Sequence, residues 1–150
     1  MLDNHRSLGR RRKEITRQLA ERLAIIQSLN PLLFVQDINR SIAFYQDNLG
    51  FQLEGKPVES NGKIFFCGLK RERCALMLQQ AEDEDGPPEH RGRGVIFYFT
   101  CDDADRMHEE LTGRGLHLKA PTTAYYGMRQ VELSDPDGYV LCFQSRVRRV

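Results

Sequence analysis

Histidine and cysteine are the side chains of this sequence that could hold a metal ion or attack a substrate. No two histidines have the short spacing of a metal-binding pair, and we expect surface or structural roles for His5, His90, His108 and His117. The cysteines are widely spaced and lie within or beside apolar runs, which is typical of buried free thiols rather than disulfides: Cys67, Cys74, Cys101 and Cys142. Nucleophilic catalysis by Cys142 would need a base and a lowered thiol pKa, and its neighbours Leu141 and Phe143 supply neither. We therefore predict no catalytic residue.

Two charged runs could bind a partner of opposite charge. The acidic run 82–85 is followed by Gly86, Pro87 and Pro88, so a solvated linker is the better interpretation than an ion site. The basic run 10–13 could contact nucleic acid or a membrane surface. Residues 10–28 also carry an apolar stripe at helical spacing, made of Ile15, Leu19, Leu23 and Ile26. We favour an amphipathic helix that packs on the domain or across a dimer, with a solvated basic face.

The composition sets limits on the class of protein. The 150 residues carry a net charge of +1, and 40% of them are hydrophobic. This charge gives no overall field that would attract nucleic acid, and no apolar run approaches the roughly 20 residues of a membrane span. The N-terminus lacks the pattern of a secretory signal. We expect one globular domain in the cytoplasm, with no membrane partner.

An internal repeat predicts the fold. An apolar run, an aspartate, a short helix and a glycine restart occur once around Asp37 and again around Asp103. In the first copy we expect a strand at 32–35, a helix at 38–49, and strands at 51–58, 63–69 and 73–80. In the second copy we expect strands at 95–101, 116–119, 128–134 and 139–145, with a helix at 103–111. The sequence thus predicts an α+β fold of two tandem βαβββ modules, 29–80 and 94–146, joined by linker 81–93, with an N-terminal helical extension over 1–28.

Turn residues support these boundaries. Asn61 and Gly62 separate two strand-like runs, and this pair favours a tight hairpin because both residues tolerate a positive φ. Near the C-terminus, Asp135, Pro136, Asp137 and Gly138 have the composition of a turn between the last two strands. Each turn therefore joins a pair of antiparallel neighbours.

The repeat also carries a recognisable motif: Val35-Gln-Asp37-x-x-x-Ser41-x-x-Phe44-Tyr45-x-x-x-Leu49-Gly50-Phe51, with Gly127-Met-Arg129 and Ser134-Asp-Pro-Asp-Gly-Tyr139 later. Over about residues 29–145 the chain resembles the vicinal oxygen chelate superfamily, which includes glyoxalase I, extradiol dioxygenases and bleomycin resistance proteins. The resemblance implies that the paired modules form a curved mixed sheet around a cleft, frequently within a homodimer.

Enzymes of that superfamily hold a divalent metal with His, Gln or Glu side chains from the first and last strands of each module. The resemblance places those four positions at Asn30, Met77, Ile96 and Cys142. None of these residues supplies the imidazole or carboxylate that Lewis-acid chemistry with zinc, nickel, manganese or iron requires. We therefore expect no metal and no cofactor, as in the metal-free branch that resembles bleomycin resistance proteins.

A cleft without a metal is still a concave pocket for a small molecule. We expect it to bind an amphipathic or aromatic compound, with Leu32 as a further wall and with the following ligand-binding residues: Asn30, Phe34, Met77, Gln79, Ile96, Tyr98, Tyr126, Arg129, Cys142 and Gln144. Within this set, Tyr126 and Arg129 are expected at the rim, where stacking and charge would contact the ligand.

Two alternatives remain open at the level of sequence. One is an enzyme, either a metal-dependent glyoxalase-like lyase or isomerase or an extradiol-type dioxygenase. The other is an interaction module in which the basic run 10–13 binds nucleic acid, with an affinity that falls steeply with salt. The leading hypothesis is a metal-independent, small-molecule-sequestering homodimer.

Overall fold

The computed structural model describes residues 3–147, excluding the side chains of residues 3–6 and 22. Helix α1 (Asp3–Arg22) precedes a first module made of β1 (Leu32–Val35), α2 (Ile38–Ala43), β2 (Gln52–Ser60), β3 (Lys63–Arg71) and β4 (Cys74–Gln80). The second module comprises β5 (Ile96–Thr100), α3 (Ala104–Gly113), β6 (Thr122–Thr123), β7 (Met128–Ser134) and β8 (Val140–Arg146). The strand orders are β1-β4-β3-β2 and β5-β8-β7-β6, with the first strand of each sheet parallel to its neighbour. The α+β fold with two βαβββ modules is confirmed.

Side-chain caps fix where the two module helices begin. The Asp37 carboxylate accepts a hydrogen bond from the backbone N–H of Arg40, and Asp103 accepts from the N–H groups of Asp105 and Arg106. Such caps satisfy amide groups that have no partner inside the helix. After Ala43, α2 continues as a wider π-type turn over Phe44–Asn48, and Gly50 then reverses the chain at φ +70°. The predicted helix starts and the glycine stop are therefore confirmed.

Between β2 and β3 the predicted hairpin forms at Asn61 and Gly62, whose φ angles are 52° and 73°. The linker between the modules is exposed over residues 82–90, which contain two short 3₁₀ turns, Asp83–Asp85 and Pro88–His90, whereas the Arg91 side chain is nearly buried and donates to Gln36 Oε1 at 2.8 Å. All four cysteines are free, and Cys67 and Cys142 are buried. These features agree with the sequence-based expectations.

The strand expected at 116–119 is absent. Leu116 and Leu118 are partly buried against the core, but they pair with no strand. The two-residue strand β6 takes the expected position in the sheet, where Thr122 and Thr123 face Gln130 and Arg129 of β7. The prediction was wrong because alternate burial of two leucines has the same period as a strand.

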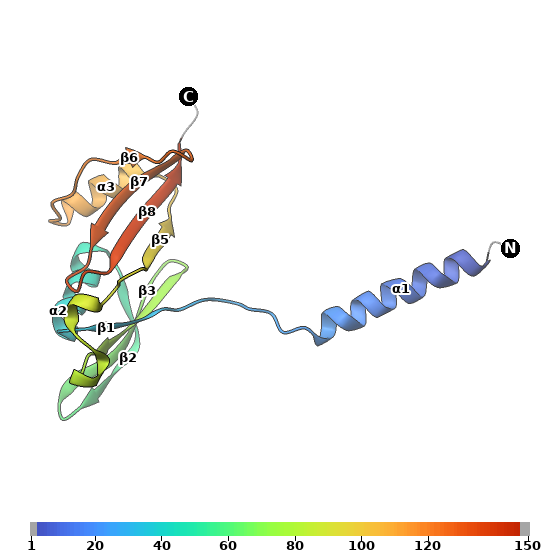
Figure 1. Ribbon diagram of the computed structural model, residues 1–150, viewed down its shortest axis with the longest axis horizontal. Coiled ribbons are helices and arrows are strands. Elements are labelled where there is room, and N and C mark those ends of the chain that lie inside the picture. The colour runs from blue at the N-terminus through green and yellow to red at the C-terminus, as the bar shows by residue number, and fades with distance from the viewer. Residues whose placement is uncertain (1–2, 148–150) are drawn as a thin grey trace.

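The N-terminal helix differs in extent from its prediction. Helix α1 ends at Arg22, so Leu23 and Ile26 belong to a non-helical segment that leads to β1. Figure 1 shows α1 projecting away from the two modules, on the side opposite α2 and α3. The large apolar residues of its stripe are more than half exposed. In the described part of the chain, no helix is long and apolar enough to span a membrane.

The core lies between each sheet and its helix and continues across the junction of the modules. Tyr45, Leu49, Leu78, Leu111 and Leu141 are fully buried members of one cluster. Aromatic rings carry this cluster from one module to the other, because Phe51 lies edge-on to Phe99 at a centroid distance of 6.2 Å. Phe99 in turn stacks on Phe143 at 5.0 Å. The modules therefore share one apolar core.

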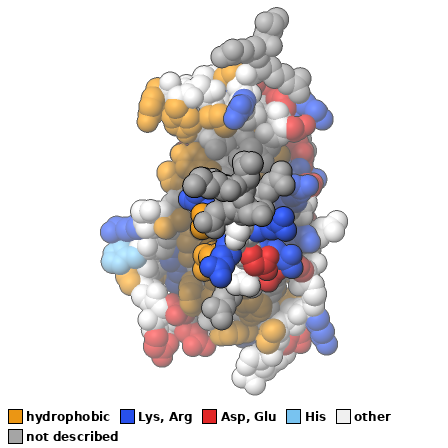
Figure 2. All heavy atoms as spheres, turned by 90° about the vertical axis from the view of Figure 1, so that its right-hand side faces the viewer, with side chains coloured by type: hydrophobic (Ala, Val, Ile, Leu, Met, Phe, Trp, Pro, Cys, Tyr) orange, Lys and Arg blue, Asp and Glu red, His pale blue; other side chains and the backbone are white. Residues whose placement is uncertain are grey.

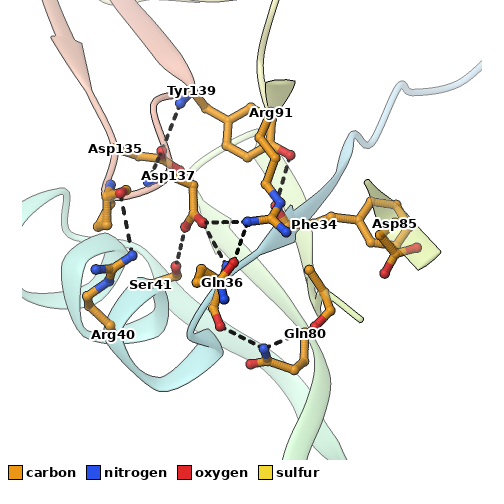
Figure 3. A network of polar contacts seen from close by, with 12 residues as sticks. Phe34, Gln36, Arg40, Ser41, Gln80, Asp85, Arg91, Asp135, Asp137 and Tyr139 are labelled. Atoms are coloured by element: carbon orange, nitrogen blue, oxygen red, sulfur yellow. Dashed lines mark hydrogen bonds and ion pairs between the residues drawn. The ribbon is translucent and has the colours of Figure 1, made fainter. Parts of the chain in front are cut away.

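The β7–β8 turn is a polar clamp on the first module. The buried Asp135 carboxylate accepts hydrogen bonds from the Tyr45 hydroxyl and from the backbone N–H groups of Asp137 and Tyr139, each at 2.9 Å. In Figure 3, Asp137 reaches the start of α2, where it accepts from the backbone N–H of Gln36 at 2.7 Å and from Ser41 Oγ at 3.2 Å. Burial raises the pKa of Asp135. The three hydrogen bonds that its carboxylate accepts act in the opposite direction but do not outweigh burial. The turn motif thus binds across the module junction as well as joining two strands.

A second clamp runs in the opposite direction, from the β3–β4 turn to α3. Arg71 donates one hydrogen bond to the carbonyl of Leu49 at 2.8 Å and another to Glu110 Oε2 at 3.0 Å. Arg114 donates to the other oxygen of Glu110 at 3.1 Å. Burial acts to raise the pKa of Glu110, but the hydrogen bonds and charges of Arg71 and Arg114 outweigh it and lower the pKa.

We expect Tyr45→Phe to destabilise the fold by about 1–3 kcal/mol, because a buried carboxylate loses a donor and keeps its desolvation cost. Urea unfolding followed by circular dichroism measures the change. The matched control is Tyr125→Phe, since Tyr125 is fully exposed. Equal unfolding free energies for both variants would contradict the clamp.

Glu110→Gln should change the pH dependence of stability. The lowered pKa means that Glu110 stabilises the fold above its ordinary value of 4.5 and loses this contribution as pH falls through the folded-state value. We expect the variant to be less stable by up to about 1 kcal/mol at neutral pH and to approach the parent protein in acid. Urea midpoints between neutral and acidic pH test this, with the exposed Glu109→Gln as control. A difference that stays constant over the whole pH range would be inconsistent with the expected titration.

Candidate functional site

Each sheet has one face under its helix and one face that no other element of the described chain covers. In β1, Leu33 and Val35 are buried under α2, whereas Leu32 and Phe34 point to the other side. In β5, Phe97 and Phe99 join the core, whereas Ile96 and Tyr98 remain 46% and 50% exposed. We call these two surfaces the open faces. Figure 1 places both on the side away from α2 and α3.

The open face of the first sheet contains half of the predicted site. Asn30, just before β1, and Met77 on β4 line a common cavity of about 630 Å³ together with Phe66, Gly68 and Lys70. Strand register explains their proximity, because Leu32 pairs with Met77 and the carbonyl of Pro31 accepts a hydrogen bond from the Met77 N–H at 2.8 Å. This half presents apolar walls, an amide and charged side chains of both signs, among them Lys70 and Glu54.

Phe34 and Gln79 extend the same face toward the end of β1. They pair directly across the parallel strands β1 and β4, and Gln79 also pairs with Phe66 of β3. All three side chains are partly buried. The amide of Gln79 therefore lies between two aromatic rings of the open face.

The open face of the second sheet contains the other half. Tyr98 pairs with Cys142, and Ile96 and Gln144 lie two residues away on the same strands and the same face. Gln130 Nε2 donates to the hydroxyl of Tyr126 and to Gln144 Oε1, the latter at 3.3 Å. A hydrogen bond with Tyr126 raises the pKa of Tyr98. A chain of phenol and amide groups therefore runs across this face.

The positions that the family resemblance assigned to metal ligands are equivalent in the two modules. Asn30 lies two residues before the partner of Met77, and Ile96 lies two residues before the partner of Cys142. The structure thus brings them together in two pairs. The described cavity around Asn30 and Met77 contains no residue of the second module.

Arg129 requires a correction, because it lies on the helix side of β7. Its neighbour Val131, which shares its face, is buried, whereas Gln130 belongs to the open face with Gln144. Its guanidinium donates to both carboxylate oxygens of Asp105 at 2.8–3.1 Å. Hydrogen bonding to Arg129 lowers the pKa of Asp105. Arg129 therefore fastens α3 to the sheet, and we remove it from the predicted rim.

The donor atoms do not fit a metal site. Within residues 3–147, leaving aside the side chains of residues 3–6 and 22, no three His, Cys, Asp or Glu residues come together in a way that could hold an ion. Burial raises the pKa of Cys142, and so does the charge of Glu132. A neutral buried thiol is a poor metal ligand and a poor nucleophile.

Several open-face residues were missed by the sequence reasoning. Glu132 pairs with Cys142, so an exposed carboxylate stands beside the second half of the site. Gln130, Phe66 and Lys70 also belong to the open faces. The alternation of Gln130, Glu132 and Ser134 along a predicted strand was a signal that could have identified two of these positions.

A larger cavity of about 830 Å³ lies at the module junction, away from the open faces. Phe51, Phe99 and Phe143 line it together with Arg71, Met107 and Glu110. Its lining comes from both modules and includes Arg71 and Glu110 of the second clamp. The sequence of one module alone therefore could not predict this cavity.

Comparisons with known proteins agree with this architecture. Among solved structures, a bleomycin-binding protein complexed with bleomycin is 19% identical, with a TM-score of 0.64, over 81% of this chain and all of the other. A glyoxalase/bleomycin resistance protein/dioxygenase from Nocardioides is also 19% identical, with a TM-score of 0.63, over 92% of this chain and 95% of that one. The bleomycin-binding protein of Streptomyces verticillus, complexed with copper(II)-bleomycin, is 18% identical, with a TM-score of 0.61, over 85% and 100%. With TM-scores of 0.61–0.64 at 18–19% sequence identity, these comparisons show a shared fold.

No curated protein matches the chain. A family model does match residues 25–143, which include the first module, the linker and the second module as far as the middle of β8. The protein therefore belongs to the glyoxalase/bleomycin resistance protein/dioxygenase superfamily.

Proposed function

We propose that this protein binds and sequesters a small amphipathic or aromatic molecule on its open faces, without a metal ion. The observation that carries the proposal is the chemistry of the four positions Asn30, Met77, Ile96 and Cys142. They occupy equivalent places in the two modules, yet they offer an amide, a thioether, an alkyl group and a thiol of raised pKa. These groups suit contact with an organic molecule better than coordination of a Lewis-acidic metal.

The surrounding side chains indicate the chemistry of the ligand. Phe34, Phe66 and Tyr98 offer aromatic surface for stacking, and the amides of Gln79 and Gln144 can orient polar groups. Charged groups of both signs are present, with Lys70 and Glu54 on the first open face and Glu132 on the second. The best fit is an aromatic or amphipathic molecule with several hydrogen-bonding groups and a small net charge.

The site consists of two half-sites on one protein, and each is open on one side. We propose that a second copy of the chain covers them in a homodimer, with residues 29–150 as the binding domain and 1–28 as an extension. The four free cysteines suit a reducing compartment, so we place the protein in the cytoplasm. The bleomycin complexes of two structural neighbours support small-molecule binding by this fold.

An enzymatic function, as a metal-dependent lyase, isomerase or extradiol dioxygenase, would require ligands that the open faces lack. Cys142 pairs with Tyr98 on one side and with Glu132 on the other, so one carboxylate is adjacent to it. No histidine pairs with Cys142 or with Glu132. No observation favours this alternative over sequestration.

Protein purified without chelators should contain no stoichiometric metal by elemental analysis, because the open faces lack a suitable donor set. A thermal-shift screen of aromatic and antibiotic compounds should give a saturable rise in melting temperature, since a ligand that binds only the folded state stabilises it. Addition of divalent metals serves as the comparison. One tightly bound metal per chain would refute sequestration without a metal.

Tyr98→Ala should weaken binding of the compound with the largest thermal shift by about tenfold or more, because it removes an aromatic surface and a phenol. Isothermal titration calorimetry measures the affinity. Tyr125→Ala is the control, since Tyr125 is exposed and belongs to the adjacent loop. Unchanged affinity in Tyr98→Ala would exclude the second open face from the site.

A further inference from the structure

We propose that α1, together with the segment that follows it, is a docking arm that packs on the open face of a second copy of this chain. The inference rests on the proposed homodimer and names the part of the second copy that covers the open face; it does not depend on a ligand being bound. It starts from the exposed apolar residues of the arm. Leu8, Ile15, Leu19 and Leu23 are 56–70% exposed, and Ile25, Ile26 and Leu29 are 81–93% exposed.

A helix with this surface needs a partner. Helix α1 has 20 residues, and most of the stability of helices in proteins comes from burial of an apolar face rather than from helix propensity. Within the described residues, the ion pair and hydrogen bonds that involve α1 side chains stay inside the helix, such as Arg17 with Glu21. Among the side chains that the structure describes, no hydrogen bond or ion pair therefore joins α1 to the chain's own modules.

The direction and reach of the arm favour a second copy. Segment 23–31 contains no helix or strand, and α1 points away from its own modules (Figure 1). A segment of this length spans up to about 30 Å, and α1 adds about 30 Å more. The apolar stripe can therefore reach a neighbouring molecule without any change in the two modules.

Net charge favours docking of the arm on the two modules of the second copy, which we call its body, over docking on the other arm. Residues 3–22 contain seven Arg or Lys and three Asp or Glu residues, which give a net charge of +4. Because the whole chain carries +1, the remainder carries −3. Two arms would repel each other, whereas an arm and a body attract.

We infer that the arm docks on the open faces, because they carry exposed apolar side chains that can pack against its apolar stripe. Val58, Ile96 and Tyr98 are 46–54% exposed there, on the face opposite the covered core. Figure 2, viewed from the side of the arm, shows hydrophobic side chains on the body behind and beside it. Glu54 and Glu132 stand on the same faces and can accept hydrogen bonds from the arginines of the arm. Reciprocal exchange of arms gives a closed twofold dimer.

The first test compares two full-length double variants by sedimentation velocity over a wide protein concentration range. Ile15→Asp with Leu19→Asp disrupts the stripe, and Gln18→Asp with Ala20→Asp adds the same charge on other sides of the helix. Neither pair touches the core, so both should fold. We expect the stripe variant to weaken self-association by at least about tenfold, with little change in the control. Equal self-association of the stripe variant and the parent protein would overturn the arm, and would leave a homodimer through the bodies unaffected.

The second test identifies the receiving surface. Val58→Asp should also weaken self-association, and a mixture of the stripe variant with Val58→Asp should associate more tightly than either variant alone, because one intact arm then meets one intact face. No gain on mixing would overturn docking on the open face. A monomeric parent protein that binds phosphatidylglycerol-containing vesicles or duplex DNA through the stripe would overturn the proposal in favour of a membrane or nucleic acid.

Discussion

The structure depends on a buried carboxylate at the junction of the two modules. Asp135 is 5% exposed, and its two oxygens accept hydrogen bonds from the Tyr45 hydroxyl and two backbone amides. A buried charge of this kind is tolerated only when donors satisfy it. One strand turn is therefore held against the helix of the other module, and the position of each sheet relative to the other follows from that contact.

The two modules are related by a pseudo-symmetry, so each module has a turn that contacts the helix of the other. The side chains that make the two contacts differ. Where the β7–β8 turn uses carboxylates toward α2, the β3–β4 turn uses the guanidinium of Arg71 toward Glu110 on α3. The aromatic contact between Phe51 and Phe99 lies between the two clamps in the shared core. Because both helices lie on the junction side, each sheet keeps a face that no other element of residues 3–147 covers.

The two faces of each sheet therefore have different surroundings. The core and the clamps use the helix side of the sheets, whereas the opposite faces carry partly exposed side chains such as Ile96 and Tyr98. Asn30, Met77, Ile96 and Cys142 belong to the open-face side, where Tyr98, Gln130 and Gln144 supply phenol and amide groups. The same open faces are the surface that we propose receives the arm of a second copy.

Much of this protein was determined by local sequence. The aspartate caps, the Asn61–Gly62 hairpin and the glycine stops act over a few residues, and strand alternation assigns Ile96 and Tyr98 to one face. Tertiary structure alone decided the rest. The orientation of Arg129 toward Asp105, the burial of Leu116 and Leu118 without strand pairing, and the insertion of Asp135 beside Tyr45 depend on which elements meet in space. Those contacts join residues far apart in the chain, and the spacing of residues along a single strand or helix contains no information about them.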